Sequence, residues 1–336
     1  MNGRTTQLYI TGVAGMIGSN IARDVTKLGV KVIGIDNFWR GTRDNLLDLL
    51  DQPNFEFRYA DIISDQDWFR DMDERSVLIH TADIVAGIGY VFANEWQVFQ
   101  KNLLINTQIA RVVSIARPER LIYLGTACSY PQSLQRSVQS SILSERQKFP
   151  ADPESGYGWS KLIGEVEFFL ATKQSPTRLL VLDLHNVYGW PCVYADDTAQ
   201  VIPALIHKAA TSTNRRLSVW GTGQQGRAFL HVLDVVSGIR AALGYDGSEK
   251  AIMLGPKNCT TIAEVARLIT EHPRMKIDRI DFDTSKPTGD IGRYADASLA
   301  LRELAWSPKV EFRDGLYGVV DQILDDLNRG QPAARK

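Results

Sequence analysis

The sequence has few cysteines, no long apolar run and no excess of charge of one sign. Its 336 residues include three cysteines, Cys128, Cys192 and Cys259, too few and too dispersed for a disulfide framework or a zinc site. No apolar run approaches the ~18 residues that cross a bilayer, and the N-terminal MNGRTTQ lacks the apolar core of a signal peptide. We therefore predict a cytoplasmic protein with no metal site and no membrane partner.

Basic blocks, repeats and low-complexity linkers are also missing. The formal net charge is −1 at pH 7, and basic clusters such as Arg215-Arg216 are short. These features argue against nucleic acid or an anionic membrane as the main partner. With 44% hydrophobic and 23% charged residues, the chain reads as an ordinary globular protein, long enough for one large domain or two interlocked ones.

A glycine-rich turn lies near the N-terminus. Residues 8–10 (LYI) predict a strand, residues 11–19 read TGVAGMIGS, and an amphipathic helix is expected to about Gly29. One glycine permits the tight turn, another lets backbone approach a pyrophosphate, and Gly18 permits close helix packing. This order predicts a dinucleotide site. Its predicted residues are Gly12, Gly15, Met16, Ile17 and Gly18.

An acidic residue ends the second predicted strand, residues 31–35. Asp36 is placed to accept hydrogen bonds from the adenosine ribose hydroxyls. A carboxylate there repels the 2′-phosphate of NADP, so NAD is the predicted cofactor. Arg40 and Arg43, just downstream, are cations that would soften this preference.

The remaining cofactor contacts are predicted beside the ends of strands. Residues 55–59 are strand-like and residues 77–82 form an apolar run typical of a buried parallel strand, and in parallel sheets ligands bind at the carboxyl ends of strands. His80, within the second run, reads as a core histidine. The other predicted cofactor residues are Asn37, Asp61, Ile62, Thr81 and Ala82; for Asp61-Ile62 the alternative is a surface turn.

Strands and helices alternate over ~180 residues, which predicts an α/β fold with a doubly wound parallel sheet of the Rossmann type. Residues 120–125 form another buried strand in this pattern. Thr126 and Cys128 follow it and would point into the crevice at the carboxyl end of the sheet. The alternative for Cys128 alone is a small buried hydrophobe.

Tyr157 and Lys161 are four residues apart, a spacing that places them on one face of a helix. A phenol titrates near pH ~10, and a neighbouring ammonium stabilises its ionised form. The pair is therefore a candidate for removing a proton from an alcohol, with the Thr126 hydroxyl bonded to the phenol. The same spacing occurs on many ordinary helices; the glycine turn and Asp36 favour the catalytic interpretation.

These features together resemble the extended short-chain dehydrogenases/reductases that act on nucleotide sugars, the NAD-dependent epimerase/dehydratase family. The resemblance runs from about Leu8 to Leu316 and includes the glycine turn and the Tyr157–Lys161 pair. Residues 125–131 (GTACSYP) resemble a segment of GDP-mannose 3,5-epimerases and GDP-fucose synthases. In those enzymes the cysteine takes part in moving protons at C3 and C5, which implies that role for Cys128.

The second half continues the resemblance. Residues 185–189 (HNVYG) are similar to a family segment whose Asn contacts the sugar diphosphate, and residues 201–206 (VIPALI) and 219–227 (VWGTGQQGR) match further family segments. Two arginines are expected on the diphosphate, because a guanidinium fork matches phosphate oxygens; the alternative is surface arginines. The implied substrate residues are Asn186, Gln200, Val201, Trp220 and the two arginines, Arg227 and Arg293.

The resemblance also implies a domain organisation and an assembly. Residues 1–183 and about 228–250 would form the NAD-binding Rossmann domain. Residues about 184–227 and 251–330 would form a smaller α/β cap domain that binds the nucleoside-diphosphate sugar, so that the two domains interleave. A homodimer formed through two long helices, one bearing Tyr157, is expected by analogy.

Two positions depart from the family. Gln200 stands where the epimerases have lysine and the fucose synthases histidine, and a glutamine amide cannot exchange protons at neutral pH. Either His185 or Lys208 substitutes, or Cys128 works alone through water, or the chemistry at the ketone differs. Asp183 stands where the families commonly carry arginine.

The leading prediction is an epimerase that inverts C3, C5 or both through a transient 4-keto sugar. Alternatives are C4 epimerisation, 4-keto reduction and dehydration after C4 oxidation. The 4,6-dehydratases carry an Asp-Glu pair beside the strand-end threonine, and Ala127-Cys128 replaces it here. A remote alternative is a non-catalytic nucleotide sensor, which the presence of both Tyr157 and Lys161 disfavours.

Overall fold

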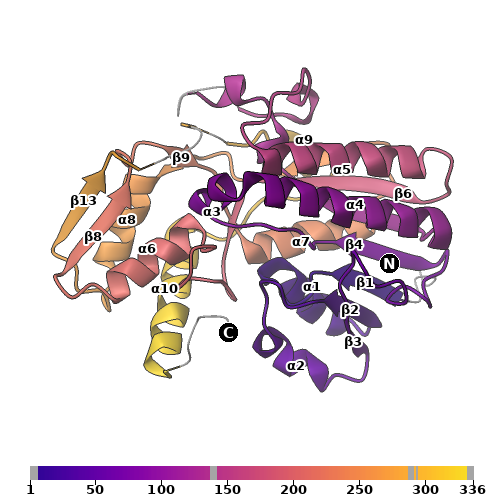
Figure 1. Cartoon of the computed structure of the whole chain (residues 1–336), viewed down its shortest axis with the longest axis horizontal. Coiled ribbons are helices and arrows are strands. Elements are labelled where there is room, and N and C mark those ends of the chain that lie inside the picture. The colour runs from indigo at the N-terminus through magenta and orange to yellow at the C-terminus, as the bar shows by residue number, and fades with distance from the viewer. Residues whose placement is uncertain (1–6, 137–141, 287–290, 293, 331–336) are drawn as a thin grey trace.

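The computed structural model describes residues 7–136, 142–286, 291–292 and 294–330 (Figure 1). Within these residues, seven strands form a parallel sheet in the order β11-β6-β5-β4-β1-β2-β3. The prediction of an α/β fold with a Rossmann-type, doubly wound sheet is confirmed. The strands are β1 (Gln7–Thr11), β2 (Val32–Asp36), β3 (Phe55–Tyr59), β4 (Ser76–His80), β5 (Arg120–Thr126), β6 (Arg178–Leu184) and β11 (Ala251–Leu254).

The strand order reverses between β1 and β4, which creates a crevice at their carboxyl ends. β4 pairs with β1 on one side and β5 on the other, so His80 lies beside Thr11 and Tyr123. These strands are continuous apolar runs because both faces of the sheet are covered. The residues that follow β1, β4 and β5 are therefore gathered along one edge.

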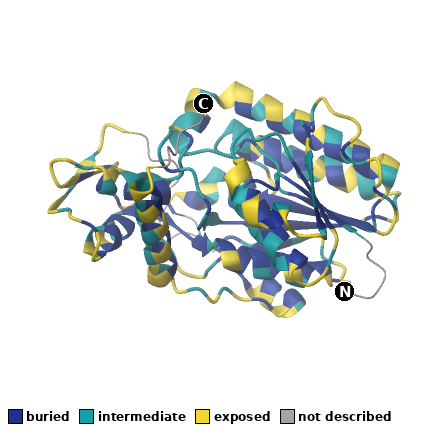
Figure 2. Ribbon diagram, turned by 90° about the horizontal axis from the view of Figure 1, so that it is seen from below, coloured by how far each residue is buried: buried dark blue, intermediate teal, exposed yellow. Residues whose placement is uncertain are grey.

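Helices cover both faces of the sheet. α1 (Met16–Thr26) and α7 (Val232–Leu243) pack on one face, and α4 (Glu95–Ala116) and α5 (Gly156–Thr172) on the other. Alternate residues along the central strands contribute to the two cores. Figure 2 shows the buried strands between helices whose outer faces are exposed.

A smaller α/β unit stands beside the large sheet (Figure 1). Its separate apolar core joins α6, α8, α10 and β8. Its helices are α6 (Val201–Ala210), α8 (Ile262–Glu271) and α10 (Phe312–Asn328). Its strand pairs, with those that connect it to the sheet, are β8 (Arg216–Trp220) with β13 (Arg279–Asp283), β9 (Gly226–Arg227) with β12 (Thr260–Thr261), and β7 (Asn186–Tyr188) with β10 (Phe229–His231).

The interleaved division into two domains stays a proposal. The pairing of the large sheet changes the boundary that was predicted at residue 251. Residues from 251 onward were predicted to belong to the cap. However, β11 is hydrogen-bonded to β6 at the edge of the large sheet, and α9 (Ser298–Leu304) packs into the same core. The short apolar run AIML at residues 251–254 extends the sheet because its backbone pairs with β6, whereas its sequence alone does not show which sheet it joins.

Candidate active site

A cleft of ≈ 1340 Å³ is lined by residues of both units, at the carboxyl edge of the sheet. All the predicted site residues within the described chain line it; Arg293 lies outside the described residues. They are, on the cofactor side, Gly12, Gly15, Met16, Ile17, Gly18, Asp36, Asn37, Asp61, Ile62, Thr81 and Ala82; at the centre, Thr126, Cys128, Tyr157 and Lys161; and on the cap side, Asn186, Gln200, Val201, Trp220 and Arg227.

The glycine turn after β1 leaves no room for side chains. Gly12 has a φ of +71°, and a Cβ on it would lie 2.9 Å from the backbone of Ala82. A Cβ on Gly18 would lie 2.3 Å from the carbonyl oxygen of Gly12. Backbone is thus exposed to the cleft where α1 begins at Met16, which suits a diphosphate bound at a helix N-terminus.

The end of β2 forms the adenosine side of the cleft. The Asp36 carboxylate accepts hydrogen bonds from the backbone N–H groups of Ala14 (2.9 Å) and Phe38 (2.7 Å). The amide of Asn37 donates to Asp61 Oδ2 at 3.0 Å, which joins the ends of β2 and β3. A fixed carboxylate beside the glycine turn fits the ribose of NAD. The residues present therefore fit the predicted cofactor.

Thr126, Cys128 and Tyr157 meet where β5 ends. Thr126 Oγ1 accepts a hydrogen bond from the backbone N–H of Cys128 (3.2 Å), at the start of the short helix η2 (Ala127–Ser129). The Thr126 side chain also lowers the pKa of the Tyr157 phenol, against the larger effect of burial. Gly158 lies so close that a Cβ there would be 2.2 Å from the carbonyl oxygen of Cys128. The phenol and the thiol are therefore held by directly packed backbone.

Lys161 is paired with Asp83. Its buried ammonium forms an ion pair with the Asp83 carboxylate and lies 4.1 Å from the centre of the Tyr123 ring. Burial raises the pKa of Asp83, and Lys161 opposes that rise. Burial, then Asp83 and Cys128, raise the pKa of Tyr157 well above its usual value. That Lys161 lowers the pKa of the phenol stays a prediction; in this structure the Lys161 ammonium is bound to Asp83.

His80 is a core histidine, in agreement with the sequence. Its Nδ1 lies 2.8 Å from Thr11 Oγ1 and its Nε2 lies 3.1 Å from Asn106 Oδ1. Burial, reinforced by the charge of Lys161, lowers its pKa to about 3. The Asn106 amide also donates to the carbonyl of Ser160 at 3.3 Å. This chain of contacts fixes α5, which carries Tyr157, to the strands β1 and β4.

Asp183, one of the two departures from the family, has a buried counter-ion. Lys148 Nζ donates to Asp183 Oδ1 at 2.9 Å and forms an ion pair with Glu165, and the Tyr130 hydroxyl donates to Asp183 Oδ2 at 2.9 Å. Asp183 is fully buried and is not part of the cleft lining in the described structure. Burial and Asp183 raise the pKa of Glu165 to about 7. The cluster joins β6, α5 and the segment that follows Cys128.

The candidates for a second proton-transfer group lie on the cap side of the cleft. Gln200 immediately precedes α6 and lines the cleft. His185 also lines it and lies 3.3 Å from the sulfur of Met253. Lys208 Nζ lies 5.1 Å from the centre of the Trp220 ring, and burial lowers the pKa of Lys208. Both proposed substitutes for the missing base therefore border the same space.

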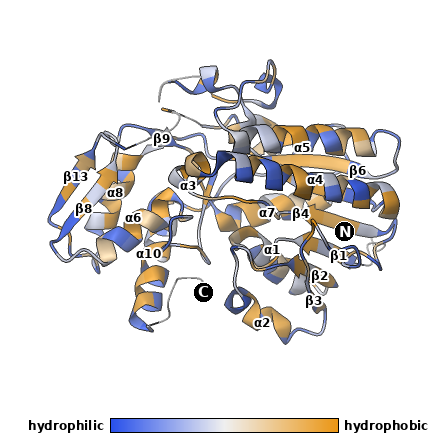
Figure 3. Ribbon diagram, viewed as in Figure 1, coloured by the Kyte–Doolittle hydropathy of each residue, from blue (hydrophilic) through white to orange (hydrophobic). Residues whose placement is uncertain are grey.

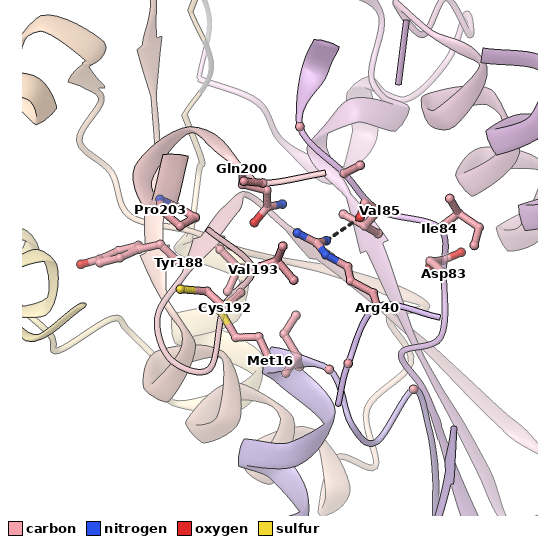
Figure 4. Close-up of a pocket in the computed structure, with 18 of the residues that line it drawn as sticks. Met16, Arg40, Asp83, Ile84, Val85, Tyr188, Cys192, Val193, Gln200 and Pro203 are labelled. Carbon is pink, nitrogen blue, oxygen red and sulfur yellow. Dashed lines mark hydrogen bonds between the residues drawn. The ribbon is translucent and has the colours of Figure 1, made fainter. Parts of the chain in front are cut away.

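Three functional contacts were missed by sequence reasoning. Asp83 as the partner of Lys161 had one visible signal, a carboxylate just beyond a strand end. No sequence signal pointed to Lys148 as the counter-ion of Asp183, because Lys148 lies in the long segment between β5 and α5. Arg40 was considered only for its effect on NADP, yet its guanidinium extends across the cleft (Figure 4).

A Rossmann sheet with a Tyr–Lys helix at its crevice defines a dinucleotide-dependent enzyme of the short-chain dehydrogenase/reductase type. The chain belongs to the NAD-dependent epimerase/dehydratase family, whose model matches residues 8–255. The predictions of this family, of an enzyme of this class and of NAD as cofactor are confirmed.

The chain is similar to GDP-mannose 3,5-epimerase 1 of Oryza sativa subsp. indica, with 27% identity over 330 residues that cover 96% of this chain and 84% of that protein. It is similar to GDP-L-fucose synthase 1 of Arabidopsis thaliana, with 26% identity over 334 residues, 97% of this chain and 96% of that protein. Its fold is similar to the crystal structure of UDP-glucuronic acid 4-epimerase from Bacillus cereus in complex with UDP-glucuronic acid and NAD, with a TM-score of 0.80, 25% identity, and coverage of 94% and 99%.

Within the described residues no helix is both long and apolar enough to cross a bilayer. In the same part of the chain, no cluster of three or more His, Cys, Asp or Glu side chains is arranged to hold a metal ion. The three cysteines form no disulfide with one another in the described structure.

Proposed function

We propose that the protein is an epimerase of a nucleoside-diphosphate sugar, GDP-linked, that works through a transient 4-keto sugar, with Cys128 moving protons at C3 or C5. The observation that carries the proposal is the meeting of Tyr157, Thr126 and Cys128 at the end of β5. Cys128 and Tyr157 line the same cleft, and the backbone of Cys128 packs against Gly158, next to Tyr157, so a sugar whose C4 hydroxyl reaches the phenol would have its neighbouring carbons near the thiol. The similarity to GDP-mannose 3,5-epimerase 1 supports the substrate class.

When bound, NAD supplies an acceptor, and later a donor, of hydride for C4 of the sugar. Tyr157 takes the proton of the C4 hydroxyl, and the Thr126 hydroxyl orients the phenol. The resulting ketone acidifies the C–H bonds at C3 and C5. Cys128 then removes a proton from one of these carbons, and His185, Lys208 or a water molecule returns a proton to the opposite face, before Tyr157 returns its proton to the C4 oxygen.

On the cap side, Asn186 and Arg227 would bind the substrate diphosphate, and Trp220 would contact the nucleotide. Arg227 is buried at the cleft and donates to the carbonyl of Gly226 at 2.8 Å, so its guanidinium is held in place. A fixed guanidinium suits bidentate binding of phosphate oxygens. Arg293 remains part of the proposal as the second cation on the diphosphate.

C4 epimerisation is the second candidate, and Gln200 favours it. Inversion at C3 or C5 uses an acid and a base on opposite faces, whereas inversion at C4 uses only hydride return to the other face of the ketone. Gln200 lines the cleft and supplies no exchangeable proton at neutral pH. The similarity to a UDP-glucuronic acid 4-epimerase supports this candidate as well.

Incubation with a panel of GDP- and UDP-sugars in D₂O, followed by NMR, separates the two candidates. Deuterium at C3 or C5 is the expected result. A changed C4 configuration without deuterium at either carbon would replace the proposal with C4 epimerisation. Turnover of no sugar, with no transient absorbance at 340 nm, would leave only the nucleotide sensor.

Variants assign the steps of the reaction. Tyr157→Phe is expected to abolish both the 340 nm transient and deuterium uptake. Cys128→Ala is expected to keep the transient and slow deuterium uptake by about a hundredfold, the usual contribution of one acid–base group. Cys259→Ala, whose cysteine lies outside the cleft lining in the described structure, is the matched control. Unchanged deuterium uptake in Cys128→Ala would remove Cys128 from the mechanism.

We further propose a homodimer formed through α4 and α5, working in the cytoplasm. The two helices lie side by side (Figure 1), and Figure 3 shows hydrophobic residues along both. Exposed apolar side chains on them are Trp96, Leu104, Ile115, Trp159, Val166, Phe169 and Leu170. Such a concentration of apolar surface marks a protein interface. Three cysteines without a disulfide among them suit a reducing compartment.

A further inference from the structure

Arg40 connects three segments that are distant in sequence. It follows β2, which ends at Asp36, and extends into the cleft (Figure 4). Its Nη1 donates to the carbonyl oxygen of Val85, in the loop after β4. Its Nη2 lies 3.3 Å from the carbonyl oxygen of Thr198, just before α6. One side chain therefore bridges the Rossmann and cap sides of the cleft.

The positive charge of Arg40 acts within the cleft. Its guanidinium lowers the pKa of Tyr157 and of Cys192, in each case against a larger effect of burial. Figure 4 shows the Arg40 guanidinium between Val85 and Gln200, with Met16 of the glycine turn drawn below it in this view. The cation thus lies among residues that line the same cleft as the glycine turn.

We propose that Arg40 binds the diphosphate of NAD and, through Val85 and Thr198, closes the cleft over the cofactor so that NAD is retained between turnovers. A guanidinium has five N–H donors in a planar fork, so one group can hold two carbonyls and phosphate oxygens together. The glycine turn supplies backbone amides to the diphosphate, and Arg40 supplies the counter-charge. The inference rests on the NAD dependence of the family and not on the proposed sugar chemistry.

The contacts of Arg40 with Val85 and Thr198 also argue against a role in binding the 2′-phosphate of NADP. The position of that phosphate is marked by Asp36, whose carboxylate is fixed by the N–H groups of Ala14 and Phe38. The Arg40 guanidinium instead extends to Val85 and Thr198. Its charge is therefore directed at the middle of the cofactor.

Exchange of bound cofactor tests the proposal directly. Purified holoenzyme is mixed with an excess of isotopically labelled NAD⁺, and the rate at which label enters the protein is followed by mass spectrometry. Arg40→Met is expected to exchange NAD at least about tenfold faster than the parent protein, since charge-assisted bonds to phosphate are lost. Arg40→Lys keeps the charge but not the fork and is expected to lie between the two.

Arg43→Met is the matched control. Arg43 is exposed, three residues further on, and is not part of the cleft lining in the described structure, so exchange should stay within about twofold of the parent. Unchanged exchange in folded Arg40→Met would overturn the proposal. If Arg40→Met does not fold, the Arg40→Lys rate decides: a rate equal to that of the parent also overturns it.

Competition experiments identify the group that Arg40 contacts. In Arg40→Met, binding of ADP-ribose should weaken as much as binding of NAD, whereas binding of adenosine should not change. Equal weakening of adenosine would assign Arg40 a purely structural role. Weakening confined to GDP and UDP would place it on the substrate diphosphate, and a larger loss for NADP⁺ than for NAD⁺ would make it a 2′-phosphate ligand. Each of these three results contradicts the proposal.

Discussion

The ammonium of Lys161 is paired with the carboxylate of Asp83, both buried at the carboxyl end of the sheet beside the Tyr157 phenol. Asp83 raises the pKa of Tyr157, and by binding Lys161 it also offsets the cation that would lower it. The pair therefore restrains ionisation of the phenol. The pKa of Tyr157 therefore depends on whether the Lys161 ammonium pairs with Asp83 or with a ligand bound in the cleft.

Asp83→Asn should shift the pH dependence of C4 oxidation to lower pH. Removing the carboxylate removes a contribution that raises the pKa of Tyr157, so the phenol ionises at lower pH. Below the optimum, the 340 nm transient should form about fivefold faster, equivalent to ~1 kcal/mol of charge interaction. The variant should also lose about 3 kcal/mol of stability, because a buried ammonium loses its partner. If the rate of C4 oxidation in Asp83→Asn falls at the same acidic pH as in the parent protein, Asp83 does not act on the phenol.

Gly158→Ala should uncouple the thiol from the phenol. The new methyl group would lie 2.2 Å from the carbonyl oxygen of Cys128, so η2 or the start of α5 must shift. A displacement near 1 Å at a reacting group costs about a hundredfold in turnover. The control is Gly318→Ala on α10, where a Cβ meets nothing within 4 Å; it should raise stability by about 0.5–1 kcal/mol. Equal turnover in the two variants would contradict the close packing.

Glu165→Gln should remove a pH dependence of stability. The pKa of Glu165 rises from 4.5 to about 7 on folding, so the folded protein binds the extra proton between these values. Its contribution to stability is complete below pH 4.5 and is lost as the pH rises to about 7, by at most about 3 kcal/mol. Glutamine mimics the protonated form, so urea unfolding between these pH values should lose this slope. Glu167→Gln on the same helix is the control, and an identical slope in both variants would argue against the buried cluster.

Leu170→Glu should convert the proposed dimer into a monomer. Leu170 on α5 is 62% exposed, and a carboxylate there could be buried in an interface only at a large desolvation cost. Light scattering after size exclusion should give one chain mass for the variant. Leu28→Glu, at a leucine 56% exposed after α1, should leave the parent mass unchanged. A parent protein that is already monomeric, or a dimeric Leu170→Glu variant, would rule out this interface.

The sheet and the cofactor side could be predicted because their signals are local. The apolar run of residues 8–10, the glycine turn and Asp36 each constrain the chain over a few residues, and β1, α1 and β2 form where these patterns predict. The sequence did not show that β11 joins the large sheet, because strand partners are set by long-range pairing.

The buried charges could not be predicted for a similar reason. Lys161 and Asp83 are 78 residues apart, and Lys148 and Asp183 are 35 apart, so no spacing rule links them. Compared with the family, which commonly carries arginine at this position, Asp183 suggested that the chain had lost a cation. The structure explains it as one half of a buried ion pair, in which Lys148 balances the charge and Asp183 Oδ2 also accepts a hydrogen bond from the Tyr130 hydroxyl.

Gln200 immediately precedes α6, at the end of the helix where unpaired amides concentrate positive potential. A lysine introduced there would be less basic than a lysine in water, because that potential disfavours its charged form. The helix N-terminus alone would thus lower the pKa of the introduced lysine, with no further substitution. Replacing this one amide by lysine would therefore add a titratable group to the lining that Gln200 shares with Tyr157 and Cys128.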